Sequence, residues 1–165
     1  MLQAASSRLA EMETGTQFQP VLDDSYIQSP STVERIYLLS GKSYYELVKA
    51  RERASRAHSV QIACKVALIR IEELCPFPYV RLREVLQRYP NANDIRWAQE
   101  EPENAGAWLH VEDRIVETLS QIRDDAILRY YGPRASAMPA PGSARAYKTE
   151  QEWYVGNLYN LPELY

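Results

Sequence analysis

Short apolar runs recur along the chain from residue 33 onward, and each run is followed by a polar turn. The runs are mostly aliphatic or aromatic, and they lie at residues 36–39, 66–71, 95–99 and 127–131. Continuous apolar stretches of this length predict buried β-strands, because both faces of such a strand are covered. The pattern therefore predicts four strands.

Helical spacing fills the gaps between these runs. Leu82, Val85, Leu86 and Tyr89 recur at i, i+3, i+4 and i+7, which predicts a helix after Pro78. The other repeats that predict helices are Tyr44, Leu47 and Val48, followed by Trp108, Val111, Ile115 and Leu119. Strands and helices thus alternate, so the sequence predicts an α/β domain with a mostly parallel sheet.

Capping signals mark two expected helix starts. Ser43 with Glu46 and Thr149 with Glu152 each form a Ser/Thr-x-x-Glu capping box. The second box predicts a short last helix, after a loop at residues 134–147 that is rich in Ala, Pro, Ser and Gly. Residues 15–33 predict an extended connector without elements. We expect a connector over residues 1–32 and the α/β domain over residues 33–165.

Length and composition narrow the class of protein. The 165 residues are 45% hydrophobic and 25% charged, which is typical of one globular domain. A net charge of −3 argues against nucleic-acid binding. Apolar runs are far shorter than the roughly 20 residues of a membrane span. Twelve Tyr stand against two Phe, which fits either half-buried interfaces or sequence drift.

The expected strand-to-helix turn at Gly41 carries the first candidate chemistry. A P-loop is rejected because Ile36 occupies the position of its first glycine. The turn still places backbone N–H groups and Lys42 at a helix N-terminus, where an anion is favoured. A capped turn with a solvated lysine is the alternative. Ligands of parallel sheets lie beyond the carboxyl ends of the strands, where this turn falls.

The acidic turn at residues 99–104 is the second candidate. Its carboxylates could bind a hard cation, but their spacing differs from that of a calcium loop. A structural or interface role is the alternative. Cys64 and Cys75 lack zinc-site spacing, so we expect no metal site. The residues alone show no catalytic constellation.

Three ordered segments resemble one family. They are residues 40–47 (SGKSYYEL), 70–78 (RIEELCPFP) and 97–108 (WAQEEPENAGAW). Together they resemble the C-terminal domain of the thiamine-dependent first component of the 2-oxoglutarate dehydrogenase complex, and of its 2-oxoadipate counterpart. Residues 12–21 and 130–151 match the family's lead-in connector and closing loop.

The resemblance implies a three-layer domain similar to the transketolase C-terminal domain, in an enzyme that decarboxylates a 2-oxo acid and passes the acyl group to lipoyl. Such enzymes serve the tricarboxylic acid cycle or lysine breakdown. Thiamine diphosphate and magnesium would lie in preceding domains, so this chain would bind neither cofactor. The implied partners are the other domains, a homodimer mate, and the acyltransferase and dihydrolipoyl dehydrogenase components. The implied location is the mitochondrial matrix, or the bacterial cytoplasm.

The resemblance also implies roles for particular residues. Lys42, Ser43 and Arg134 would form an effector site for acyl-CoA or AMP. The acidic turn would make inter-domain contacts, through Glu100, Glu101, Asn104 and Trp108. The family pattern changes at two positions, because Pro133 intervenes before Arg134 and Tyr147 replaces a common histidine.

Two functional hypotheses follow. In the first, the chain is a C-terminal piece of the decarboxylating component, without membrane or nucleic-acid contacts, and is inactive alone. In the second, it is a free-standing module that senses acyl-CoA or nucleotide, or docks to the complex. A general protein–protein module is a third option.

Overall fold

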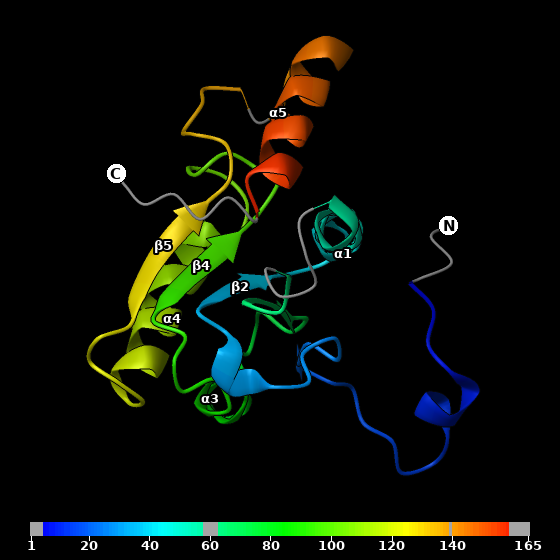
Figure 1. Cartoon of the computed structure of the whole chain (residues 1–165), viewed down its shortest axis with the longest axis vertical. Coiled ribbons are helices and arrows are strands. Elements are labelled where there is room, and N and C mark those ends of the chain that lie inside the picture. The colour runs from blue at the N-terminus through cyan, green and yellow to red at the C-terminus, as the bar shows by residue number, and fades with distance from the viewer. Residues whose placement is uncertain (1–4, 58–62, 139, 159–165) are drawn as a thin grey trace.

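The computed structural model describes residues 5–57, 63–138 and 140–158 (Figure 1). Strands and helices alternate, as the sequence predicts. In chain order the elements are η1 (Leu9–Met12), β1 (Val21–Leu22), η2 (Pro30–Thr32), β2 (Arg35–Leu39), α1 (Ser43–Ala57), β3 (Val66–Ile71), α3 (Tyr79–Gln87), β4 (Asp94–Ala98), α4 (Trp108–Ser120), β5 (Ile127–Tyr131) and α5 (Ala144–Gly156).

The sheet has five strands in the order β1-β3-β2-β4-β5. Strands β3, β2, β4 and β5 are parallel, whereas β1 pairs antiparallel with β3. The mostly parallel sheet predicted from the apolar runs is therefore confirmed. The carboxyl ends of β2 and β4 are neighbours, because Leu39 and Ala98 are register partners.

Helices α3 and α4 cover one face of the sheet. Their apolar stripes, including Leu82, Val85 and Ile115, pack against Ile36 and Leu38 of β2. The i, i+3, i+4 spacing that predicts these helices is the spacing of their buried side chains.

Helices α1 and α5 cover the other face, which makes a three-layer domain (Figure 1). Leu47 of α1 packs with Leu39 and Leu68 of the sheet. Tyr37, Tyr131 and Tyr154 meet at the α5 end of this face, with the Tyr37 and Tyr131 rings 4.9 Å apart. The surplus of tyrosine is thus partly used in the core.

The N-terminal segment departs from the expected connector, because it supplies β1 and η2. Its anchor is Asp24, which accepts hydrogen bonds from Arg51 at 2.5 and 2.9 Å and from the Leu68 amide at 2.8 Å. The Tyr26 ring lies 4.7 Å from the Arg51 guanidinium. A strand of two residues has no periodic pattern, so β1 could not be predicted from the sequence. Residues 5–19 are exposed and extend away from the domain (Figure 1).

Both capping boxes are wrong in detail. Ser43 is the first residue of α1, and its hydroxyl donates to the Ser40 carbonyl at 3.2 Å. Helix α5 begins at Ala144, with Ser143 as its N-cap accepting from the Ala146 amide. Thr149 therefore lies inside α5, where its hydroxyl donates to the Arg145 carbonyl. The loop expected at residues 134–147 ends four residues earlier than predicted.

None of the helices described here is long and apolar enough to cross a membrane.

Candidate functional site

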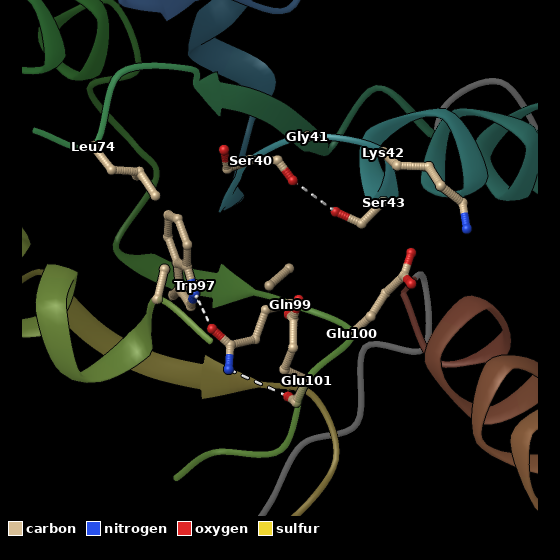
Figure 2. A pocket seen from close by; sticks show the side chains of 11 residues that line it. Ser40, Gly41, Lys42, Ser43, Leu74, Trp97, Gln99, Glu100 and Glu101 are labelled. Carbon is tan, nitrogen blue, oxygen red and sulfur yellow. Dashed lines mark hydrogen bonds between the residues drawn. The ribbon is translucent and has the colours of Figure 1, made fainter. Parts of the chain in front are cut away.

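A pocket of about 300 Å³ opens beyond the carboxyl ends of β2 and β4 (Figure 2). We name it the turn pocket, because the turns that follow these two strands line most of it. Ser40, Gly41, Lys42 and Ser43 come from the first turn, and Gln99, Glu100 and Glu101 come from the second. Trp97 and Leu74 close its apolar side. This is the position that parallel sheets favour for ligands.

The first turn carries the predicted lysine. Gly41 adopts a φ of +69°, which turns the chain from β2 into α1 without a side-chain penalty. Lys42 is solvated, and its ammonium lies 3.8 Å from a Glu46 carboxylate oxygen one helical turn later. The lysine charge at the mouth of the pocket is therefore partly neutralised.

The second turn is organised by Gln99, which is 5% exposed. Its side-chain oxygen accepts from the Trp97 indole at 2.8 Å and from the Trp108 amide at 3.0 Å. Its amide nitrogen donates to three carbonyls of the turn, those of Glu101, Pro102 and Ala105, at 3.2, 3.1 and 2.8 Å. One buried amide thus fixes the whole acidic turn and the start of α4.

Close packing around Gln99 requires two glycines. Gly106 has a φ of +63°, and a Cβ there would lie 3.0 Å from Gln99 Nε2. A Cβ on Gly132 would lie 2.6 Å from the Gln99 carbonyl oxygen. The Tyr130 hydroxyl bridges the same region, donating to the Glu101 carbonyl at 2.7 Å and the Pro133 carbonyl at 3.0 Å.

Asn104 ties the acidic turn to the segment after β5. Its side-chain amide donates to the Ser136 carbonyl at 3.0 Å, and its side-chain oxygen accepts from the Ser136 amide at 2.9 Å. The Glu103 amide also donates to the Pro133 carbonyl. The acidic turn, which forms one rim of the turn pocket, is therefore held rigidly against the segment after β5.

Carboxylates dominate the charge of the site. Burial raises the pKa of Glu100, and the nearby Glu46 and Glu101 raise it further, while Lys42 opposes them. The Glu100 side chain points toward the space between α1 and α5 (Figure 2). A group whose pKa is raised in a pocket is a candidate binding residue.

The structure brings some of the predicted site residues together in the turn pocket and places the others outside its lining. Lys42, Ser43, Glu100 and Glu101 come together at the turn pocket. Arg134 is exposed after β5 and is absent from the lining of that pocket. Asn104 and Trp108 support the rim through the hydrogen bonds described above.

Gln99 is the residue that sequence reasoning missed. A glutamine between a strand and an acidic turn has no periodicity that marks it as buried. Gly106 and Gly132, which pack closely against Gln99, are the sequence features that could have indicated its burial.

Side chains that could bind a metal ion are dispersed over the part of the chain that is described. Within residues 5–57, 63–138 and 140–158, no three His, Cys, Asp or Glu side chains come together as a metal site. His110 is bonded elsewhere, with its Nε2 lying 2.9 Å from the Leu74 carbonyl.

The fold assigns the chain to a structural class. It matches a solved structure described as "Split gene transketolase, inactive beta4 tetramer", with a TM-score of 0.53 and 11% identity over 88% of this chain and 43% of that chain. The domain therefore has the transketolase C-terminal-like α/β fold. The family follows from the sequence, because the family "2-oxoglutarate dehydrogenase C-terminal" matches residues 6–158. The chain belongs to that family, which confirms the resemblance.

Curated relatives agree with this assignment. The 2-oxoglutarate dehydrogenase E1 component of Coxiella burnetii is 38% identical over 158 residues, which is 95% of this chain and 16% of the relative. The 2-oxoadipate dehydrogenase complex component E1 of Danio rerio is 38% identical over 148 residues, which is 90% of this chain and 15% of the relative. The chain thus spans about one sixth of the length of these relatives.

Proposed function

We propose that this chain serves as the C-terminal assembly domain of a 2-oxo acid dehydrogenase first component and is inactive alone. In the whole enzyme, decarboxylation and acyl transfer to lipoyl would be performed by other domains. Family membership and the small share of the relatives' length support this proposal. The acid would be 2-oxoglutarate or 2-oxoadipate, because relatives of both kinds match equally well.

Exposed apolar side chains carry the proposal. Leu109 and Val116 lie two turns apart on the outer face of α4 and are 68% and 50% exposed. Among the described strands, β5 lies at the edge of the sheet, beside α4, and Ile127 on it is 53% exposed. Edge strands and exposed apolar side chains of this kind fit contact with another part of a larger protein. Glu100 and Glu101 on the rigid rim would add polar contacts.

The cofactors and partners belong to the same proposal. Thiamine diphosphate and magnesium would bind in other domains of the whole enzyme, as membership of the family implies. The partners would be those domains, a homodimer mate, and the acyltransferase and dihydrolipoyl dehydrogenase components. The location would be the mitochondrial matrix or a bacterial cytoplasm, because relatives of both origins match.

An activity assay tests this proposal directly. We expect the purified chain, supplied with thiamine diphosphate and magnesium, to release no carbon dioxide from 2-oxoglutarate or 2-oxoadipate. The full-length Coxiella burnetii relative serves as the positive control. Turnover by the chain alone would contradict the proposal.

The turn pocket supports a second candidate function, which is regulation by an anionic effector. Lys42 and the N-terminus of α1 border a pocket that could admit part of an acyl-CoA or AMP molecule. Glu46 and the pocket carboxylates oppose such an anion, and Arg134 would have to assist from the exposed segment after β5. Calorimetry with CoA esters and AMP tests this function. Lys42→Ala should abolish binding while Lys49→Ala, an exposed change on the same helix, leaves it intact.

A further inference from the structure

Three buried polar atoms gather around one hollow on the α5 side. This second hollow, which we name the α5 pocket, has a volume of about 190 Å³. Its polar lining consists of Glu100, Glu101, Tyr147, Glu150, Gln151 and Tyr154. In the described part of the chain, the buried side-chain atoms without a hydrogen-bond partner are Glu100 Oε1, Gln151 Oε1 and the Tyr154 hydroxyl oxygen. All three therefore belong to residues that line the same pocket.

Such atoms call for an explanation, because buried polar groups are almost always paired. Tyr154 is the clearest case, since the residue is 2% exposed and its hydroxyl has no partner. Burial raises the pKa of the Tyr154 hydroxyl, and the nearby Ser43 hydroxyl, which donates to the Ser40 carbonyl, offsets that rise only in part. These atoms line a pocket of about 190 Å³, so a donor group that enters the pocket would complete their hydrogen bonds.

The charge of the pocket indicates whether the bound group would be a cation or an anion. Three carboxylates line it, from Glu100, Glu101 and Glu150, and no Lys, Arg or His is among its described lining residues. An anion would be repelled. A metal ion is also disfavoured, because these carboxylates do not converge as a metal site within the described chain.

The unpaired atoms also indicate which chemical group the pocket would bind. A carboxylate oxygen, an amide oxygen and a hydroxyl oxygen can all accept hydrogen bonds, and an ammonium group offers three donors. The aromatic faces of Tyr147 and Tyr154 suit a cation as well. The volume lies below the roughly 300 to 1,000 Å³ of pockets for drug-sized ligands, so it suits one small head group.

We propose that the α5 pocket binds a primary ammonium group on a short aliphatic chain, held by Glu100, Gln151 and Tyr154. The group could come from a free amine or from a lysine side chain of another protein segment. The α5 pocket shares Glu100 and Glu101 with the turn pocket, but the rest of its lining comes from α5 and from residues 133, 140 and 141. The inference does not depend on the chain being part of a dehydrogenase.

Binding should depend on pH through Glu100. The charged groups that act on Glu100 are Glu46 of α1, Lys42 in the turn before α1, and the neighbouring Glu101. Burial raises its pKa, and a bound ammonium would lower that pKa again, because it favours the carboxylate. Affinity should therefore rise with pH until Glu100 is fully ionised, and binding below that point should release a proton.

The test is a titration of the 165-residue chain with n-butylamine, followed by NMR at Gln151 and Tyr154. n-Butanol is the uncharged control, and butyrate is the anionic one. A blocked peptide with one lysine, compared with its norleucine analogue, distinguishes a protein side chain from a free amine. We expect butylamine to bind at least about tenfold more tightly than butanol, as a charge-assisted hydrogen bond implies.

Variants locate the site. Glu100→Gln should weaken amine binding about tenfold or more, and Tyr154→Phe should weaken it severalfold. Glu150→Gln, on the exposed side of α5, gives a second charge change with little risk to folding. Glu152→Gln is the matched control, because it removes the same charge from the same helix outside the pocket lining. It should change affinity less than twofold.

Several results would overturn the proposal. They are equal binding of butylamine and butanol, no binding of either the amine or the lysine peptide, and amine binding that Glu100→Gln and Glu150→Gln leave unchanged. Binding of the lysine peptide alone would support the site and assign it to a protein segment. The NMR spectra also report whether each variant is folded. The outcomes do not depend on whether the chain has enzymatic activity, so they are distinct from a test of the proposed function.

Discussion

Different kinds of side chain cover the two faces of the sheet. The face under α3 and α4 is dominated by aliphatic side chains, among them Ile36, Leu82 and Ile115. The face under α1 and α5 contains a tyrosine cluster, formed by Tyr37, Tyr131 and Tyr154. Aliphatic packing is nondirectional, whereas each buried tyrosine hydroxyl needs a partner.

The tyrosine cluster meets this need only in part. Tyr37 donates to the Leu158 carbonyl at 3.1 Å, and Tyr131 donates to the Tyr154 carbonyl at 2.5 Å. These bonds attach α5 and the residues after it to the sheet. The Tyr154 hydroxyl is left unpaired. The face under α1 and α5 therefore gives up some stability at the Tyr154 hydroxyl, which lines the α5 pocket.

The largest expected effect lies on the α1 side, at the Asp24–Arg51 pair. Asp24→Ala should destabilise the chain by about 3 to 5 kcal/mol, because it removes the carboxylate partner of a buried guanidinium. Chemical denaturation measures this loss. Glu52→Ala, an exposed change on α1, should stay within about 0.5 kcal/mol. Equal effects of the two substitutions would show that the N-terminal segment is not part of the core.

The aliphatic face should respond next. Leu82→Ala should cost about 2 to 5 kcal/mol, since the side chain is fully buried and its removal leaves a cavity. Val80→Ala on the same helix is the control, because Val80 is 63% exposed. Urea denaturation of both variants measures the difference. A loss below 1 kcal/mol for Leu82→Ala would contradict the assigned core.

A smaller loss is expected in the tyrosine cluster. Tyr131→Phe removes the hydrogen bond to the Tyr154 carbonyl and should cost about 1 kcal/mol. The same denaturation assay measures it. Increased hydrogen exchange in α5 should accompany the loss, since this bond attaches the helix to the sheet. Unchanged exchange would refute that attachment.

Tyr154→Phe should behave in the opposite way. Its hydroxyl is buried without a partner, so removal should leave stability unchanged or raise it by up to about 1 kcal/mol. Comparing the midpoints of Tyr154→Phe and Tyr131→Phe provides the measurement. A clear destabilisation by Tyr154→Phe would mean that the hydroxyl is already paired in the free protein.

The smallest expected effect depends on pH. Burial raises the pKa of Glu100 above its ordinary value, so the folded chain holds this proton more tightly than the unfolded chain. Ionisation of Glu100 should therefore lower stability as the pH rises from about 4.5 through the raised pKa. Glu100→Gln should remove this fall. Denaturation curves at pH 4 and pH 7 test it, and a constant difference between variant and wild type would contradict the shift.

The two faces also differ in how well the sequence predicts them. Leu82, Val85 and Leu86 fall on one stripe, so the periodicity reveals α3 directly. Helix α5 begins in a stretch of Ala, Ser, Gly and Pro that resembles a loop. Its start depends on the Ser143 cap, and its last turns pack through Trp153 and Tyr154 against Tyr131 of β5. The buried role of Gln99 depends on neighbours from three segments, which no local pattern encodes.

The central claim is that this domain supports assembly while the chemistry lies elsewhere. The most direct measurement uses the Coxiella burnetii relative, with its matching C-terminal segment either deleted or replaced by this chain. We predict that deletion abolishes decarboxylation of 2-oxoglutarate and that replacement restores it together with the native oligomeric state. Full activity of the deleted enzyme, or decarboxylation by this chain alone, would contradict the claim.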